Sequence, residues 1–179
     1  MVEGVFGLPG SGKSTYLAKL AQKAIKRNIK VYSNFYIKGC YKLDFDDLGV
    51  HDYSDCLLLI DEISLFCDCR SWKNFNADLV YFFTNHRHYN VDIVYCSQSY
   101  ADCDKKIRNL TDSLYYIRPF LGFFSSVRRI EKAFTVDTEI QESYTLSGIP
   151  RLVLRCRYYK YFDSFVRRSL PPNTANKWD

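Results

Sequence analysis

The hydrophobic pattern of the first sixty residues alternates between short apolar runs and a longer segment with helical spacing. Residues 2–6 form an apolar run that predicts a strand, and residues 14–28 carry apolar side chains on one helical face. Further strands are predicted at residues 30–34 and 56–60. The run at 56–60 is apolar throughout, which is typical of a central parallel strand covered on both faces.

The alternation continues along the chain to residue 118. A helix is expected at residues 76–88, a strand at 91–96, a short helix at 105–110 and a strand at 113–118. Repeated alternation of strand and helix predicts an α/β fold with a mostly parallel central sheet flanked by helices. Ligands of such sheets bind at the carboxyl ends of the strands.

Beyond Pro119 the pattern changes to strands without intervening helices. Residues 127–134 and 151–162 are predicted to form C-terminal antiparallel strands, either as a separate hairpin or as an extension of the sheet. The stretch at residues 144–148 contains serine and glycine and is interpreted as a turn.

The segment from residue 151 to residue 161 has two different alternating faces. One holds Leu152, Leu154, Cys156 and Tyr158, and the other holds Arg151, Arg155, Arg157, Tyr159 and Tyr161. Cations beside aromatic rings suit nucleic acid, because phosphates take the arginines and bases stack on tyrosine. An exposed edge strand protected by charge carries the same pattern, so both interpretations stay open.

Composition narrows the class of protein. A chain of 179 residues that is 47% hydrophobic can bury one sizeable core. The formal net charge of +5 comes from residues 100–179, which contain 14 basic and 9 acidic residues. Residues 1–99 contain 11 basic and 11 acidic residues. Seven cysteines without a C-x-x-C pair favour a reducing compartment over a disulfide framework. We expect neither a signal peptide nor a membrane span.

The strongest chemical signal is a phosphate-binding loop between the first predicted strand and helix. Glycines let successive backbone N–H groups curl around phosphates, and the following helix adds the positive end of its dipole. The sequence therefore predicts that ATP binds here, with Lys13 on the β- and γ-phosphates, Ser14 on Mg²⁺ and Thr15 near the α-phosphate. The candidate nucleotide-binding residues are Gly7, Leu8, Pro9, Gly10, Ser11, Gly12, Lys13, Ser14 and Thr15.

Three further positions indicate hydrolysis. Asp61 ends the apolar run at 56–60 and is the candidate metal-side carboxylate, and Glu62 is the candidate base that activates water. Gln98 follows the next strand, where its amide could bond both the γ-phosphate and the attacking water. A turn or capping role for Gln98 remains the alternative.

Transition-state charge needs more cations than one lysine and one metal ion. Arg70, Arg87 and Arg108 are candidates, acting on the nucleotide of a neighbouring subunit, and Arg87 is taken as the catalytic candidate. His86 and His88 flank Arg87 on different helix faces, which argues against a shared metal site.

The phosphate-binding loop, Asp61-Glu62 and the stretch from Arg87-His88 through Asp92-Ile93 to Gln98 together resemble the zonula occludens toxin family, which includes filamentous-phage assembly ATPases. That family is similar to the FtsK/HerA branch of P-loop ATPases. The resemblance implies a Mg²⁺-dependent ATPase of phage morphogenesis, DNA export or DNA packaging. It also implies a homo-oligomeric ring, such as a hexamer, with single-stranded DNA or phage coat and assembly proteins as partners.

The resemblance also guides the expected boundaries and location. We expect one ATPase domain over residues 1–168, with a core at about 1–120, an extension at 121–168 and a disordered tail at 169–179. Filamentous-phage members usually continue into a membrane-spanning helix, and this chain ends after a polar stretch. We therefore expect the host cytoplasm, including the cytoplasmic face of the inner membrane through partners.

Two other functions remain open at this stage. Thymidine kinases also pair a phosphate-binding loop with an Asp-Glu dipeptide ahead of an aromatic residue, as Phe66 stands here, but they usually carry paired zinc-binding cysteines. A nucleotide-gated interaction module would instead use ATP to switch its contacts with a membrane or coat protein.

Overall fold

The computed structural model of the chain describes residues 1–65, 77–101, 103–136 and 140–163. Eight strands form one sheet in the order β3-β2-β4-β5-β1-β6-β7-β8. The sheet is parallel from β3 to β6 and antiparallel from β6 to β8. The strands are β1 (Val2–Phe6), β2 (Lys30–Ser33), β3 (Tyr41–Lys42), β4 (Cys56–Ile60), β5 (Asp92–Ser97), β6 (Ser113–Phe120), β7 (Phe124–Val136) and β8 (Ile140–Leu154).

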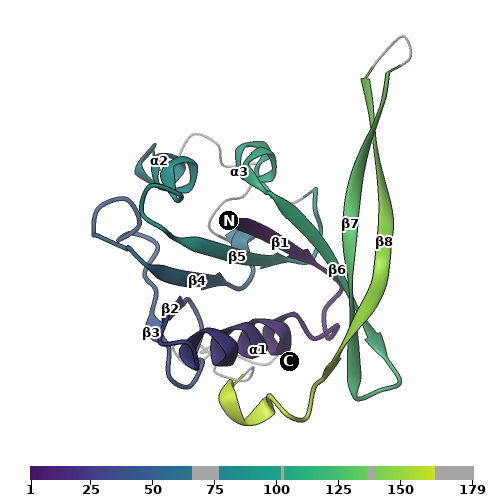
Figure 1. The fold of residues 1–179 in the computed structure, drawn as a ribbon, viewed down its shortest axis with the longest axis horizontal. Helices are drawn as coiled ribbons and strands as arrows, with labels where there is room; N and C mark the ends of the chain where they lie inside the picture. Colours follow the sequence, from purple (N-terminus) through teal and green to yellow (C-terminus); the bar gives the residue numbers. More distant parts are fainter. Residues whose placement is uncertain (66–76, 102, 137–139, 164–179) are drawn as a thin grey trace, which may run out of the picture.

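Helices cover both faces of the parallel part of the sheet (Figure 1). Helix α1 (Lys13–Ile25) lies on one face, and helices α2 (Ala77–Asn85) and α3 (Lys105–Leu110) lie on the other. Two short 3₁₀ helices, η1 (Ile63–Leu65) and η3 (Tyr159–Tyr161), follow β4 and β8. The predicted α/β fold with helices on both faces is confirmed.

The core consists of two apolar clusters separated by the sheet. Strand β5 shows the reason for this arrangement, because Ile93 and Tyr95 pack into the cluster under α2 and α3. Val94 and Cys96 point to the opposite face and pack against α1. Successive side chains of a strand point to opposite faces, so a strand covered on both faces must be apolar at every position.

Strands β7 and β8 form a long ribbon that runs beyond the rest of the sheet (Figure 1). Pairing between β6 and β7 ends at Leu114 and Ile130, whereas pairing between β7 and β8 continues to Val136 and Ile140. Among the described residues, β8 pairs only with β7. The C-terminal antiparallel strands therefore extend the sheet instead of folding separately.

The segment at residues 151–162 differs from the sequence-based expectation. The strand predicted at 151–162 ends at Leu154, and η3 follows after a turn. Val153 is buried, at 1% exposed, whereas Leu152 is 49% exposed, so the predicted apolar face is the solvent face. Alternation along the sequence therefore places Leu152 and Val153 on the wrong faces of the strand.

Residues 144–148 were predicted as a turn, and this prediction is wrong. Tyr144 to Ser147 pair with β7 within β8, and the register shifts between Val127 and Arg129. Gly148 has a positive φ of 71° beside this irregularity. The serine and glycine therefore mark a bulge in a continuous strand, which is a common role of glycine inside strands.

None of the helices in the described ranges is both long enough and apolar enough to cross a membrane. The predicted tail at residues 169–179 lies outside the described residues.

Candidate functional site

The phosphate-binding loop connects the carboxyl end of β1 to the amino end of α1, which is the context that the motif requires. Gly10 and Gly12 have positive φ values of 74° and 98°. A Cβ atom on Gly12 would collide with the Ser125 hydroxyl. Both positions therefore need glycine, and the loop forms a cradle of backbone N–H groups that fits a chain of phosphates.

Lys13 is buried at the base of this cradle, with 7% of it exposed. Its ammonium donates to the carbonyl of Gly7 at 2.8 Å and to that of Leu8 at 3.4 Å. The Lys13 Nζ also lies 3.7 Å from Glu62 Oε1. A compact, strongly hydrated ammonium is costly to bury without partners. The two carbonyls and Glu62 keep the charged Lys13 side chain at the base of the loop, where it can bind a phosphate.

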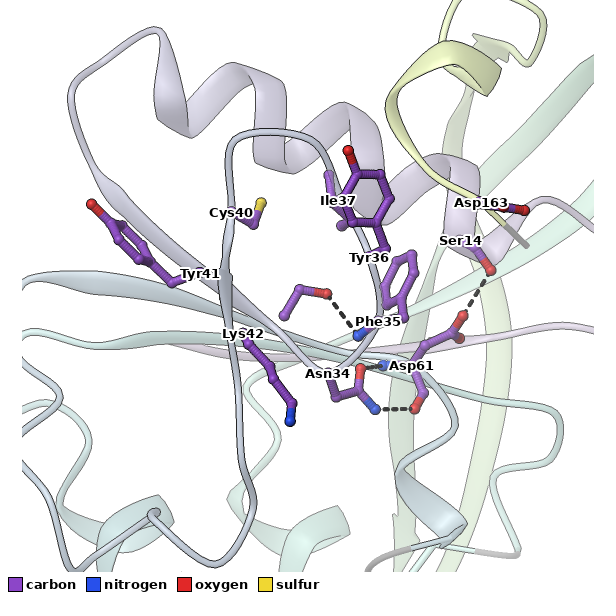
Figure 2. A pocket seen from close by; sticks show the side chains of 11 residues that line it. Ser14, Asn34, Phe35, Tyr36, Ile37, Cys40, Tyr41, Lys42, Asp61 and Asp163 are labelled. Atoms are coloured by element: carbon purple, nitrogen blue, oxygen red, sulfur yellow. Dashed lines mark hydrogen bonds between the residues drawn. The ribbon is translucent and has the colours of Figure 1, made fainter. Parts of the chain in front are cut away.

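Ser14 and Asp61 meet where the loop faces the end of β4 (Figure 2). The Ser14 hydroxyl donates to Asp61 Oδ2 at 2.7 Å. A hydroxyl and a carboxylate side by side are the oxygen ligands that Mg²⁺ prefers, together with water and substrate phosphates. These two side chains therefore fit the magnesium site predicted from the sequence.

Asn34 fixes the position of Asp61, which the sequence analysis did not foresee. The Asn34 side chain donates to the Asp61 carbonyl and accepts from the Asp61 amide, both at 2.8 Å (Figure 2). Because both bonds go to the backbone, they hold the start of the Asp61 side chain and leave its carboxylate free for other contacts. Asn34 comes directly after β2, the strand beside β4.

Glu62 follows Asp61 with a left-handed backbone, φ 51°, which is uncommon for a non-glycine residue. Backbone strain of this kind concentrates at functional sites. Burial raises the pKa of the Glu62 carboxyl, and the Asp61 charge raises it further, against the lowering effect of Lys13. A carboxylate with a raised pKa is a better proton acceptor than an ordinary surface glutamate.

Gln98 stands directly after β5 and lies beside Glu62. A hydrogen bond from Gln98 to the Glu62 carboxylate is among the interactions that lower the pKa of Glu62. The structure therefore brings Glu62 and Gln98 together at the carboxyl ends of adjacent strands. The amide is placed to orient the carboxylate.

These side chains line one cavity of about 370 Å³ above the phosphate-binding loop. Thr15 is buried and borders the cavity, whereas the Leu8 side chain is exposed and does not. Gly7 and Leu8 instead contribute carbonyls that hold Lys13. The predicted residues in the lining are Pro9, Gly10, Gly12, Lys13, Ser14, Thr15, Asp61, Glu62 and Gln98.

Arg87 does not reach this cavity in its own subunit. Its guanidinium bonds Asp112 Oδ1 at 2.7 Å, and Asp112 Oδ2 accepts from the amide of Val2. Val2 begins β1, so Arg87 lies at the amino ends of the strands, opposite the phosphate-binding loop. A catalytic role for Arg87 would therefore require the nucleotide of a neighbouring subunit.

The other two predicted arginines are not in the cavity lining either. Arg108 belongs to α3, and its guanidinium stacks over the ring of Tyr100 at 5.0 Å. Arg70 lies outside the described residues.

Arg155 is the cation that the structure does place beside the loop. Its Nε donates to Ser125 Oγ at 2.8 Å, and its Nη2 donates to the Ser11 carbonyl at 3.0 Å. The Ser125 hydroxyl donates to the same carbonyl at 2.7 Å. The alternating pattern of residues 151–161 places Arg155 only on a general basic face, because its proximity to the loop depends on where β8 ends.

A second cavity of about 560 Å³ adjoins the first at Ser14 and Asp61 (Figure 2). Its other wall is formed by the segment between β2 and β3, where Tyr36 is exposed, and by β3, where Tyr41 is exposed. The segment between β2 and β3 is bonded to η3, because the Lys38 amide donates to the Tyr161 carbonyl at 2.7 Å. Isolated pairing of Ile37 with Phe162 adds to the same connection.

One protein-family model matches the chain. The model of the family described as zonular occludens toxin (Zot) matches residues 43–167 of the chain. The matched range contains Asp61, Glu62, Gln98 and Arg155, and the phosphate-binding loop precedes it. A search of curated protein sequences gives no match.

Several solved structures are similar in fold at low sequence identity. The N-terminal domain of zonular occludens toxin from Neisseria meningitidis has a TM-score of 0.55 at 17% identity, over 90% of this chain and 98% of that one. The genome packaging NTPase B204 of Sulfolobus turreted icosahedral virus 2, in complex with AMP, has a TM-score of 0.54 at 12% identity, over 82% and 96% of the two chains. The flagellar accessory protein FlaH of Methanocaldococcus jannaschii has a TM-score of 0.50 at 13% identity, over 83% and 89%.

Proposed function

Because the chain belongs to the zonular occludens toxin family, we propose that it is a Mg²⁺-dependent ATPase whose hydrolysis drives the packaging, export or assembly of viral or mobile-element DNA. The observation that carries the proposal is the grouping of Ser14, Asp61, Glu62 and Gln98 around one cavity over the phosphate-binding loop. B204, which has been crystallised with ATPγS and with AMPPCP, supports the binding of a nucleotide by this fold.

The residues divide the chemistry of hydrolysis among them. The backbone of the loop and Lys13 bind the phosphates, and Ser14 and Asp61 would hold Mg²⁺. When bound, the metal ion would supply charge that stabilises the transferred phosphoryl group. Glu62 accepts the proton of the attacking water, and Gln98 holds the Glu62 carboxylate in place.

The acceptor of the phosphoryl group is water in this proposal. The Glu62 carboxylate lies next to Asp61 and is paired with the amide of Gln98, directly after β5, and this arrangement suits activation of a small nucleophile. Hydrolysis by a motor of this family would act on single-stranded DNA or on coat and assembly proteins. We propose a homo-oligomeric ring in the host cytoplasm, including the cytoplasmic face of the inner membrane.

The substitution Glu62→Gln tests this proposal. It removes the proton acceptor with little change in shape, so we expect ATP turnover to fall by about 10²- to 10⁴-fold. Binding of a non-hydrolysable ATP analogue should remain, and single-stranded DNA should raise the turnover of the unchanged protein. Glu131→Gln, on the exposed part of β7, is the matched control and should hydrolyse ATP normally.

Equal turnover of Glu62→Gln and the unchanged protein would contradict the assignment of the base. Stimulation by a coat or assembly protein without any response to DNA would instead favour a nucleotide-gated interaction module.

A second candidate function is a nucleoside kinase, because the cavity of about 560 Å³ lies against Ser14 and Asp61, where an acceptor could approach. Incubation with γ-labelled ATP and thymidine separates the two functions. Label in a nucleoside monophosphate would establish the kinase, and label only in inorganic phosphate would establish hydrolysis.

A further inference from the structure

The guanidinium of Arg155 lies at the phosphate-binding loop with part of its hydrogen-bonding capacity unused. Arginine has five N–H donors, and two of them bond Ser125 Oγ and the Ser11 carbonyl. The other donors have no hydrogen bond with any residue in the described ranges. Arg155 is half-buried and lines the same cavity as Lys13 and Gln98.

Both partners of Arg155 are neutral, so its charge has no ion pair within the described part of the chain. A guanidinium stays protonated at all ordinary pH values, and its planar fork matches phosphate oxygens. Partial burial of a cation without a paired anion is unfavourable, and an anionic ligand would remove this cost. Arg155 lies beside a loop whose geometry fits phosphates, so a phosphate is a suitable anion. The nucleotide is the ligand that this loop binds.

The order of the strands decides which part of the nucleotide Arg155 meets. The loop follows β1, with β4 and its Asp61 on one side and β7 and β8 on the other. Arg155 enters from the β8 side, close enough that a Cβ on Gly12 would lie 3.3 Å from its Nε. It therefore approaches the loop from the side opposite the metal and Glu62.

We infer that Arg155 binds, within its own subunit, the α- or β-phosphate that ATP and ADP share. This inference rests on the nucleotide binding of the proposed function and does not depend on hydrolysis. The arginine is then a binding residue, distinct from any arginine that a neighbouring subunit supplies to the γ-phosphate.

Ser125 and Arg155 also connect the strands β7 and β8 to the phosphate-binding loop. Ser125 belongs to β7, Arg155 follows β8, and both are bonded to the Ser11 carbonyl of the loop. A nucleotide bound to Arg155 therefore also stabilises the base of the ribbon against the loop.

The test is the affinity for ADP, measured by calorimetry, in Arg155→Ala. Loss of one charge-assisted contact to phosphate corresponds to about 1.5–3 kcal/mol, which is roughly a ten- to hundredfold loss of affinity. We expect an equal loss for ADP and for a non-hydrolysable ATP analogue. Arg157→Ala, an exposed arginine two residues along the same segment, is the matched control and should keep the original affinity.

Unchanged ADP affinity in Arg155→Ala would overturn the inference, and so would a loss confined to the ATP analogue, because that result places the arginine on the γ-phosphate. If Arg155→Ala does not fold, Arg155→Lys replaces it, since lysine keeps the charge but cannot hold the fork geometry. We expect at least a threefold loss of ADP affinity in that variant, and no loss would overturn the inference. Absence of ATP hydrolysis would leave these affinities measurable and would count only against the proposed function.

Discussion

Asn34 connects the magnesium side of the site to the segment between β2 and β3. Its two bonds of 2.8 Å to the backbone of Asp61 hold the metal-side carboxylate, and no other side chain among the described residues makes this pair of contacts. Residues that orient metal ligands are nearly as important as the ligands themselves. The role of Asn34 is therefore positioning, through Asp61.

The variant Asn34→Ala tests this role, because it removes both bonds and leaves the Asp61 carboxylate in the chain. We expect the Mg²⁺ concentration required for half-maximal turnover to rise by about tenfold or more. Affinity for a metal-free nucleotide should change little. An unchanged Mg²⁺ requirement would show that Asp61 is positioned without Asn34.

The surroundings of Glu62 determine how the rate of ATP hydrolysis should depend on pH. Burial raises the pKa of its carboxyl, and only the ionised form accepts a proton, so turnover should fall as the pH drops through this raised pKa. The Gln98 hydrogen bond lowers the pKa of Glu62, so Gln98→Ala should move the acidic limb of the profile to higher pH. A limb that stays in place or moves to lower pH in this variant would contradict the assignment.

At the scale of elements, the parallel half of the sheet could be predicted because its signals are local. The run at residues 56–60 is apolar at every position, and β4 has the same limits in the structure. The helix predicted at residues 105–110 is also found with those limits. Asp61 and Gln98 follow such strands directly, so their convergence at one edge follows from the strand pattern.

The antiparallel half could not be predicted in the same way. The length of β8 is set by its pairing with β7 across a bulge, which leaves no local signal beyond Gly148. Because the strand ends at Leu154, Arg155 turns toward the loop instead of continuing an alternating face. The role of Asn34 could not be predicted for a similar reason. Its partner Asp61 is 27 residues away in the sequence, and the two come together only because β2 pairs with β4.

At the scale of the whole molecule, the position of Arg87 makes the proposed ring testable. Arg87 is exposed at the edge opposite its own phosphate-binding loop, so a catalytic role for it would require the nucleotide of a neighbouring subunit. Lys13→Ala and Arg87→Ala should each abolish most turnover when assayed separately. Mixing the two variants should restore about a quarter of the turnover, because random assembly of a ring pairs an intact loop with an intact arginine at that frequency.

Mixed assemblies that stay inactive, while each variant still assembles and Arg87→Ala still binds ATP, would exclude Arg87 as the arginine supplied in trans.

The outer part of the ribbon of β7 and β8 is a free arm, because β7 pairs with β6 only as far as Ile130. Six residues of β7 extend beyond the last pair with β6, which corresponds to a free arm of about 20 Å. A rotation of about 10° at Ile130, where the pairing with β6 ends, would move the far end of this arm by roughly 3 Å, given the strand rise from which the arm length is taken. A small rotation at the edge of the sheet would thereby become a displacement of several ångströms at the far end of the ribbon.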